Sequence, residues 1–210
     1  MIEIKNIDKA FEGKQVFKNF SEKIESGEFV VFSGESGCGK TTLLNIIGGL
    51  EKTDSGCVIV DGIDIGKRKN KLKYFRFKVG FLFQNFALME NETVEENLKI
   101  VRNLNDPHLI SETLKKVELE GYEEKKIYKL SGGEQQRVAL ARLMLKKCDI
   151  ILADEPTGSL DKRNASTVIE ILKELNKEGK TVIIVTHDES IKKMGNRIIE
   201  LKTFNEKDKS

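Results

Sequence analysis

The sequence predicts an α/β protein built on a mainly parallel sheet. Short apolar runs of strand length recur at Val79–Phe83, Ile150–Ala153 and Thr181–Thr186. Segments with helical periodicity separate these runs, and 210 residues is the length of one domain, or of one domain with an insertion. Buried strands that alternate with helices are typical of parallel sheets covered by helices.

The composition is that of an ordinary folded chain. Hydrophobic residues make up 39% of it and charged residues 33%, which is above the ~25% of typical domains. The 36 basic and 34 acidic residues leave a net charge of +2, so the charge balance gives no reason to expect a nucleic-acid partner. We exclude a disordered chain and treat residues 1–210 as a single domain.

Neither a membrane span nor a secretion signal is predicted. No apolar run approaches the ~18 residues that a span needs, and the start at Met1–Lys5 contains an acid with no apolar stretch after it. The cysteines Cys38, Cys57 and Cys148 are too widely spaced for a disulfide framework or a metal site. We therefore expect a protein of the reducing cytoplasm.

The first part of the chain is expected to contain short strands around one helix. Residues 1–32 alternate apolar and polar side chains, with Gly13 and Gly27 at turns, which predicts an N-terminal antiparallel β subdomain. The next expected elements are a strand at Phe29–Phe32, a helix at Thr42–Leu50 and a strand at Cys57–Val60.

Helices and strands alternate in the rest of the chain. Helical patterning without a convincing strand begins at about residue 86, and with a helix expected over 134–147 it predicts a helical insertion at roughly 86–145. The helix expected at Thr167–Glu178 carries an apolar stripe and is ended by Gly179. A last strand is expected at Ile198–Leu201.

Polar residues follow four of the expected strands at the point where each strand ends. In open parallel sheets the ligand site lies beyond the carboxyl ends of the strands. We therefore expect a lysine-bearing loop, an amide, two carboxylates and an imidazole to meet at one rim of the sheet. The four junctions are Phe32 with Ser33, Phe83 with Gln84, Ala153 with Asp154, and Thr186 with His187.

Residues 34–41, named here the lysine loop, match the pattern G-x-x-x-x-G-K-S/T. Glycines let backbone N–H groups turn inward around phosphates, and the helix that follows adds its positive N-terminal end. Lys40 is expected to reach the β- and γ-phosphates of a nucleotide, and the Thr41 hydroxyl to ligate Mg²⁺. A plain tight turn is the alternative, but the apolar strand before the loop and the helix after it favour a nucleotide site.

Two adjacent acids, Asp154 and Glu155, follow the buried strand Ile150–Ala153. Asp154 would hold Mg²⁺, often through water, and Glu155 would polarise the attacking water. A solvated strand end is the alternative, and the lysine loop in the same chain favours the catalytic interpretation.

The segment Leu130–Arg137 provides a second helix start that is suited to phosphate. Ser131 and Glu134 have capping-box spacing, which by itself indicates only a helix cap. Gly132 and Gly133 leave the amide groups at this helix start uncovered, which also makes an anion site. A nucleotide loop together with a second phosphate-ready helix end indicates a shared site.

Residues Leu130–Gln136 resemble the signature of the ATP-binding cassette (ABC) ATPases. Gln84 resembles that family's Q-loop, Ser159-Leu160-Asp161 its D-loop and His187 its switch histidine, and the similarity covers nearly the whole chain. The resemblance implies a P-loop NTPase core, ATP hydrolysis with Mg²⁺, and a homodimer. In that dimer each ATP would lie between the lysine loop of one copy and Ser131–Gly133 of the other, at the γ-phosphate.

The resemblance also implies roles for single residues. Gln84 would sense Mg²⁺ and water and move with a transport partner, and His187 would contact the γ-phosphate. Phe11 takes the place of a tyrosine that stacks on adenine, with a core position as the alternative. Cys38 lies beside Lys40 among the loop amides, which raises the hypothesis of a reactive thiol that nucleotide protects.

The site predicted in this way has three parts. The expected catalytic residues are Lys40, Gln84, Glu155 and His187; the expected Mg²⁺ ligands are Thr41, Gln84 and Asp154; the expected nucleotide-binding residues are Phe11, Gly34, Glu35, Ser36, Gly37, Cys38, Gly39, Lys40, Thr41, Thr42, Ser131, Gly132, Gly133 and Asp161.

A basic run at Lys67–Lys78 stands apart from these motifs. Nucleic-acid binding and a place near anionic lipid headgroups are two interpretations. Its position just before the strand that leads to Gln84 favours a third, a solvated basic helix.

The stretch Ile151–Asp161, with Gly48-Gly49-Leu50 and the short length, most resembles the lipoprotein-release, macrolide-export and bacteriocin- or antimicrobial-peptide-export subgroup. This implies an ATPase subunit that powers export through a separate permease docked near Gln84 and the helical insertion, at the inner face of the cell membrane. A soluble ABC ATPase acting on nucleic acid or ribosomes, and a cell-division regulator, are the alternatives. The nucleic-acid class usually carries paired cassettes, coiled coils or zinc modules, none of which the sequence contains.

Overall fold

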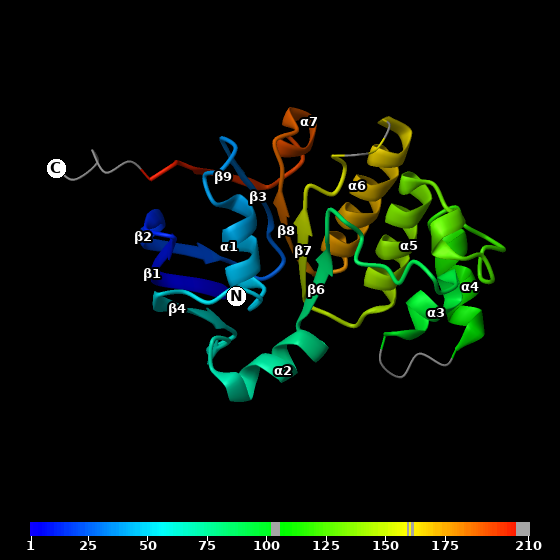
Figure 1. The fold of residues 1–210 in the computed structure, drawn as a ribbon, viewed down its shortest axis with the longest axis horizontal. Helices are drawn as coiled ribbons and strands as arrows, with labels where there is room; N and C mark the ends of the chain where they lie inside the picture. Colours follow the sequence, from blue (N-terminus) through cyan, green and yellow to red (C-terminus); the bar gives the residue numbers. More distant parts are fainter. Residues whose placement is uncertain (102–105, 159, 161, 205–210) are drawn as a thin grey trace.

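Two sheets organise the chain, and the computed structural model describes residues 1–101, 106–158, 160 and 162–204 (Figure 1). One sheet is antiparallel and formed by the N-terminal part of the chain, and the other is parallel. The predicted α/β architecture, a P-loop NTPase core with an N-terminal antiparallel subdomain, is therefore confirmed.

The antiparallel sheet has the strand order β2-β1-β4-β5. Ile2 and Ile4 of β1 are buried on one face, and the register shift between Ile4 and Ile7 returns Ile7 to the same buried side. The strands are β1 (Ile2–Phe11), β2 (Lys14–Ile24), β4 (Ser55–Val60) and β5 (Ile63–Asp64).

The parallel sheet has the order β6-β7-β8-β3-β9. Every residue of β8 is buried, because helices or the other sheet cover both faces of this strand. Parallel alignment brings the carboxyl ends of β3, β6, β7 and β8 to one rim, as predicted. The strands are β3 (Phe29–Gly34), β6 (Val79–Leu82), β7 (Ile150–Asp154), β8 (Thr181–Val185) and β9 (Arg197–Leu201).

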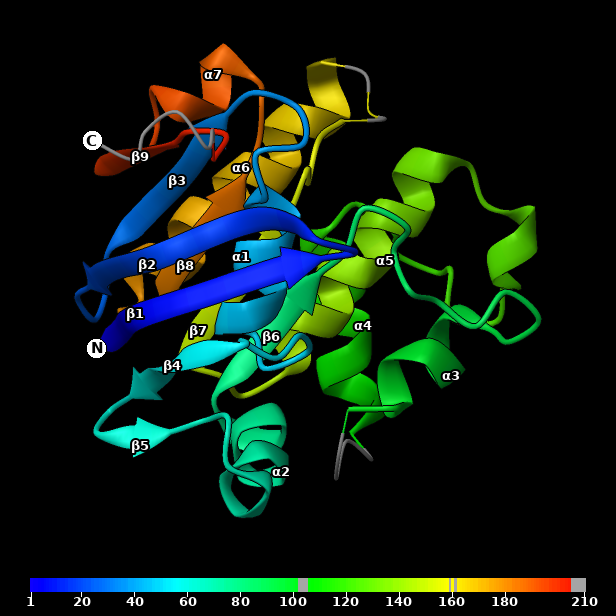
Figure 2. The same cartoon turned by 60° about the vertical axis from the view of Figure 1, so that its left-hand side comes forward.

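Helices pack on both faces of the parallel sheet and extend beyond its β6 edge (Figures 1 and 2). Helices α3 and α4 both pack against α5, within the stretch predicted to be an insertion at 86–145, and that boundary stays a prediction. In the described part of the chain, none of the helices has the length and apolar character needed to cross a bilayer. The helices are α1 (Lys40–Ile47), α2 (Arg68–Phe77), α3 (Val94–Lys99), α4 (Pro107–Lys116), the 3₁₀ helix η1 (Ile127–Lys129), α5 (Gly132–Leu145), α6 (Lys162–Lys177) and α7 (Glu189–Lys192).

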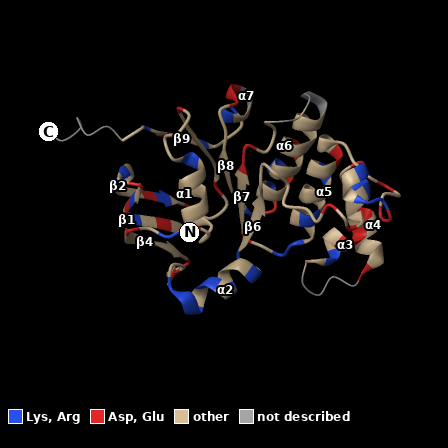
Figure 3. Ribbon diagram, viewed as in Figure 1, with Lys and Arg blue, Asp and Glu red and all other residues tan. Residues whose placement is uncertain are grey.

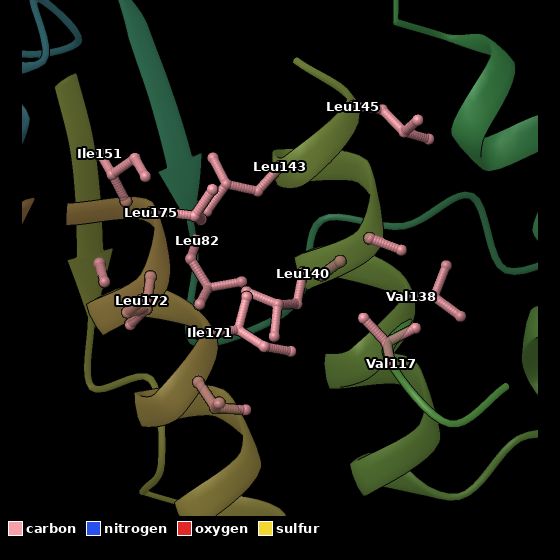
Figure 4. Close-up of a cluster of buried hydrophobic side chains, with 14 of the residues drawn as sticks. Leu82, Val117, Val138, Leu140, Leu143, Leu145, Ile151, Ile171, Leu172 and Leu175 are labelled. Atoms are coloured by element: carbon pink, nitrogen blue, oxygen red, sulfur yellow. The ribbon is translucent and has the colours of Figure 1, made fainter. Parts of the chain in front are cut away.

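Alternate residues of β3 point into two separate hydrophobic cores. Val30 and Phe32 pack with α1 and the antiparallel sheet, whereas Val31 packs in the core that contains α5 and α6. Figure 4 shows part of the second core, where Leu82 of β6 lies near Leu140 of α5. The parallel sheet therefore separates α1 from α5.

Three helix boundaries differ from the sequence prediction. Helix α1 ends at Ile47 rather than Leu50, because Gly49 adopts a left-handed φ of +71° and terminates it. Helix α5 begins at Gly132, two residues before the expected start, because Ser131 caps it, and it ends at Leu145 rather than at residue 147. Helix α6 begins at Lys162, five residues before the apolar stripe that revealed it.

Candidate nucleotide-binding site

The lysine loop connects β3 to α1, and two of its glycines, Gly34 and Gly39, leave no room for a side chain. A Cβ on Gly34 would lie 2.3 Å from the Leu201 carbonyl oxygen, and one on Gly39 would lie 2.4 Å from Cγ1 of Val16. Both glycines also have positive φ, +148° and +97°. The loop is thus held in a tight curve directly before the N-terminus of α1, which is the geometry of an anion site.

The side chain of Lys40 lies across this loop. Its Nζ donates to the carbonyl oxygens of Gly34 and Glu35, at 2.8 Å in both cases. The ammonium group is therefore held at the loop and not extended into solvent, where it can contribute positive charge to a bound phosphate.

A hydroxyl and a carboxylate meet at the start of α1. Thr41 Oγ1 donates to Asp154 Oδ1 at 3.1 Å. Burial raises the pKa of Asp154, and the negative charge of Glu155 raises it further. A carboxylate in such surroundings gains from a nearby cation, so the site suits a metal ion or a cationic partner.

A hollow of about 480 Å³ adjoins this pair, and Gln84 and Asn85 lie in its wall together with Thr41 and Asp154. The hydroxyl, carboxylate and amide oxygens of Thr41, Asp154 and Gln84 are the hard donors that Mg²⁺ prefers. The donor set therefore fits the predicted Mg²⁺ site.

The carboxylate of Glu155 is oriented by two neighbours at the end of β8. Its Oε1 lies 2.8 Å from Nδ1 of His187, and Thr186 Oγ1 donates to its Oε2 at 3.1 Å. Thr186 is fully buried, and Glu155 itself has a strained φ of +44°. This backbone and these contacts fix the carboxylate at the rim, as a general base requires.

Ser131, Gly132 and Gly133 lie elsewhere, at the start of α5. Ser131 Oγ accepts from the Glu134 amide at 3.3 Å, and Glu134 Oε2 accepts from the Ser131 amide at 2.8 Å, so the predicted capping box is present. Ser131 and Gly132 are exposed. Helix α5 packs on the face of the parallel sheet opposite α1, so this helix start and the lysine loop belong to different layers of the chain (Figure 1).

The predictions for the Phe11 ring and for the Cys38 thiol have different outcomes. The side chain of Phe11 is 43% exposed, with Lys9 Nζ 4.5 Å from its ring centroid, which rules out the core alternative and leaves the ring free to stack. Cys38 is only 2% exposed, so the hypothesis of a readily labelled thiol is not supported. Ser159 and Asp161, predicted from the D-loop resemblance, lie outside the described residues.

Sequence reasoning missed two positioning residues. Thr186 was assigned only to a strand, because its hydrogen bond to Glu155 joins residues 31 positions apart and depends on tertiary packing. Arg142 donates to the carbonyl oxygens of Ala87 and Phe86, at 2.6 and 2.8 Å, and so ties α5 to the segment after Gln84. No local signal reveals that contact, because it joins residues more than fifty positions apart.

Comparison with known proteins finds relatives that belong to the ABC transporters. A family described as ABC transporter matches residues 17–158. The chain is 44% identical to the macrolide export ATP-binding/permease protein MacB of Mannheimia succiniciproducens over 96% of this chain and 33% of that protein, so it spans about a third of that relative's length. It is 39% identical to the ABC transporter ATP-binding protein YxdL of Bacillus subtilis, over 98% of this chain and 86% of that protein.

Solved structures agree with these sequences. The dimeric, post-hydrolysis structure of the cassette MJ0796 of Methanocaldococcus jannaschii, bound to ADP and Pi, matches with a TM-score of 0.87 at 40% identity. The match covers 97% of this chain and 95% of that one. The fold, the family match and relatives of similar length agree, and the chain belongs to the ABC transporter family as one of its ATP-hydrolysing cassettes.

Proposed function

We propose that this cassette powers export through a separate membrane permease by hydrolysing ATP at sites shared between two copies of the chain. The observation that carries the proposal is the separation of two phosphate-ready helix starts. The lysine loop lies on one face of the parallel sheet, and the exposed Ser131–Gly133 end lies on α5, on the other. A second copy would bring such an end to the lysine loop.

The contacts at the rim support a role for each residue in hydrolysis. Lys40 supplies positive charge to the β- and γ-phosphates, and Thr41, Gln84 and Asp154 would hold Mg²⁺. When bound, Mg²⁺ would neutralise phosphate charge. Glu155 accepts a proton from the attacking water, while Thr186 and His187 orient its carboxylate.

The remaining roles follow from position and from the resemblance. Phe11 presents an exposed ring on which adenine stacks. The other loop residues, Glu35, Ser36, Gly37, Cys38 and Thr42, surround the phosphates with backbone amides, and His187 contacts the γ-phosphate. From the partner copy, Ser131, Gly132 and Gly133 contact the same phosphate, and Asp161 belongs to the same interface.

The names of the relatives support export and dimerisation. MacB is named for macrolide export and as an ATP-binding/permease protein, and MJ0796 is described as dimeric and as a bacterial ABC transporter cassette. The permease of this chain would dock near Gln84 and the helical insertion, where Arg142 ties α5 to the segment after Gln84. Docked in this way, the cassette would lie at the inner face of the membrane, and the permease would contact the peptide, bacteriocin or lipoprotein cargo.

Trapping the ATP-bound dimer tests this proposal. Glu155→Gln keeps the shape of the side chain but cannot accept a proton, and loss of a general base typically slows hydrolysis about 10²–10⁴-fold. The variant is expected to elute as a dimer with MgATP and as a monomer with MgADP in size-exclusion chromatography. Adding Ser131→Arg should abolish the dimer, because the new side chain occupies the space of the γ-phosphate.

A matched control separates the shared site from general disturbance. Ser111→Arg places the same side chain on an exposed position of α4, and it should leave the trapped dimer intact. A Glu155→Gln chain that stays monomeric with MgATP, or that dimerises equally with MgADP, would contradict the shared site.

A further inference from the structure

Helix α2 carries an unusual concentration of positive charge. Five of its ten residues are basic, Lys67 and Lys78 flank it, and it contains no acid (Figure 3). Nothing in the proposed ATP site uses this helix, since it precedes β6 and the rim begins after that strand. The proposed ATP site therefore does not explain the positive charge of α2.

The helix is anchored along one side only. Tyr74 is its one buried residue, and the Tyr74 hydroxyl donates to the Ile47 carbonyl oxygen at 2.9 Å. Asn70, four residues before it, donates from Nδ2 to the Asp64 carbonyl oxygen at 2.7 Å. Since residues three and four apart share a helix face, the outward face is the opposite one. The exposed residues on and beside this outward face are Arg68, Lys69, Leu72, Lys73 and Arg76, whereas Phe77, three residues after Tyr74, is exposed at the C-terminal end of the helix.

The cations on this face do not serve the fold through ion pairs. The flanking residues do: Lys67 lies 3.8 Å from Asp64, and Lys78 lies 2.6 Å from Asp149. Within the described ranges, no carboxylate lies within 4 Å of a basic residue inside α2 itself. In α3, by contrast, Lys99 pairs with Glu95 in the usual i,i+4 arrangement.

Two large apolar side chains of this helix are also exposed, Leu72 on the outward face and Phe77 at its C-terminal end. Leu72 is 57% exposed and Phe77 is 53% exposed, and the cations lie between and beside them. Cations with interspersed Leu and Phe are the composition of a helix that lies at a lipid interface.

A basic hollow adjoins the helix. It has a volume of about 330 Å³, and Lys52, Lys67 and Lys71 lie in its wall. The carboxylates there are already matched, because Glu51 pairs with Lys9 at 2.7 Å and Asp64 with Lys67. The ammonium groups of Lys52 and Lys71 add positive charge to this hollow, which is large enough to hold a phosphate headgroup.

We propose that the outward face of α2 docks the cassette on anionic phospholipid headgroups at the membrane surface. This inference uses the proposed function only in that a permease would bring the cassette to a membrane. Cations attract the phosphates over about a Debye length, and Leu72 and Phe77 enter the headgroup region. Lipid accounts for the charge and for both apolar residues, whereas a nucleic acid accounts for the charge and leaves Leu72 without a role.

Vesicle flotation of the full chain tests the proposal. The wild type should float with vesicles of phosphatidylglycerol mixed with phosphatidylcholine, not with phosphatidylcholine alone, and high salt should release it. A fourfold variant on α2 should bind about a thousandfold more weakly, because each basic residue near such a surface contributes about a fivefold gain in affinity. The substitutions are Arg68→Gln, Lys69→Gln, Lys73→Gln and Arg76→Gln.

The control variant removes the same number of positive charges from a different part of the surface. A fourfold variant at exposed lysines outside α2 should keep wild-type binding, while Leu72→Ser with Phe77→Ser should weaken binding several-fold without changing net charge. Circular dichroism confirms that each variant is folded. The control substitutions are Lys115→Gln, Lys116→Gln, Lys125→Gln and Lys129→Gln.

Three results would overturn the proposal. These are equal losses in the two fourfold variants, equal flotation with uncharged vesicles, or binding to single-stranded RNA through α2 with none to vesicles. The α2 variants should keep the ATP-dependent dimer of the Glu155→Gln chain. Loss of lipid binding with the dimer retained therefore concerns α2 alone, and loss of the dimer in the Glu155→Gln chain concerns the shared ATP site.

Discussion

The chain contains two helix starts suited to phosphate, and they are built in opposite ways. At α1 the cap residue is Gly39 in a left-handed conformation, and within the described ranges no side chain caps the helix. At α5 the cap is complete, since Ser131 and Glu134 exchange hydrogen bonds. The start of α1 therefore keeps its amide groups free for an external anion, whereas at α5 the capping box uses the amides of Ser131 and Glu134 and, within the described ranges, leaves those of Gly132 and Gly133 for an anion.

The two helix starts also differ in their packing and in their charge. Helix α1 lies between the two sheets with Leu43, Leu44, Ile46 and Ile47 buried, and Lys40 stands at its start. The start of α5 is exposed, and it carries the carboxylate of Glu134. One helix start is a binding site formed within a single chain. Under the proposed function, the other would gain a ligand only when a second copy meets it, and ATP would then link the two copies.

The largest expected effect comes from breaking the α1 side. Lys40→Ala removes the cation that lies across the lysine loop, and loss of such transition-state charge stabilisation costs about 3 kcal/mol, roughly a hundredfold in rate. Phosphate release by the purified chain, with and without its permease, measures it. Because the hydrogen bonds of the Lys40 ammonium within the described residues go to backbone oxygens of its own loop and to the Cys38 thiol, the variant should fold normally. Activity within threefold of the wild type would contradict the assignment.

A smaller effect is expected at the buried carboxylate beside this loop. The pKa of Asp154 is raised in the folded chain by burial, so its ionised form is disfavoured by folding at neutral pH. Stability of the nucleotide-free chain should fall as the pH rises from the ordinary pKa of aspartate through the raised one, and Asp154→Asn should remove that dependence.

Thermal unfolding at neutral pH measures this change. Asp154→Asn should raise the Tm of the nucleotide-free chain by about 2–4 °C, as about 1 kcal/mol does in a chain of this size. The gain in Tm that MgATP gives the wild type should shrink in the variant. Thr41→Val, which removes the hydroxyl donor to Asp154, serves as the comparison, because it should not raise the Tm. An unchanged or lowered Tm in Asp154→Asn would contradict the conclusion that burial of the ionised Asp154 carboxylate destabilises the folded chain.

The sequence predicted those features of the fold and the site that depend on local patterns, and it missed those that depend on contacts between distant residues. Strands such as β7 and β8 were predicted within a residue, because a short, fully apolar run between polar ends has few other uses. The meeting of Asp154 with Thr41 at one rim followed from parallel topology and was also predicted.

Contacts that depend on tertiary packing were not predictable. The hydrogen bond from Thr186 to Glu155 and the contact of Arg142 with Phe86 each join distant segments through side-chain rotamers. Periodicity carries no such information. The same applies to Cys38, where sequence proximity to Lys40 indicated an accessible thiol and packing of the loop buries it.

The smallest expected effect concerns the α5 side. Hydrogen bonds from the Ser131 amide and hydroxyl hold the pKa of Glu134 below its usual range. A lowered folded pKa means that the cap contributes fully above the ordinary pKa of glutamate and is lost as the pH falls through the lowered one. Because this carboxylate is only partly buried, we expect Glu134→Ala to cost only about 0.5 kcal/mol of local helix stability, at the lower end of capping effects.

Hydrogen exchange of the first-turn amides of α5 measures this local stability. Glu134→Ala should speed their exchange at neutral pH about twofold, in line with about 0.5 kcal/mol. Glu134→Gln should keep the cap through its amide oxygen and lose the pH dependence. The capping box of Thr93 and Glu96 in α3 is an internal reference whose exchange should not change in either variant. The start of α1 has no acid in its first turn, so its exchange should respond to MgATP and not to these substitutions. If Glu134→Ala altered the two helix starts equally, the contrast between a self-capped end and an open one would be wrong.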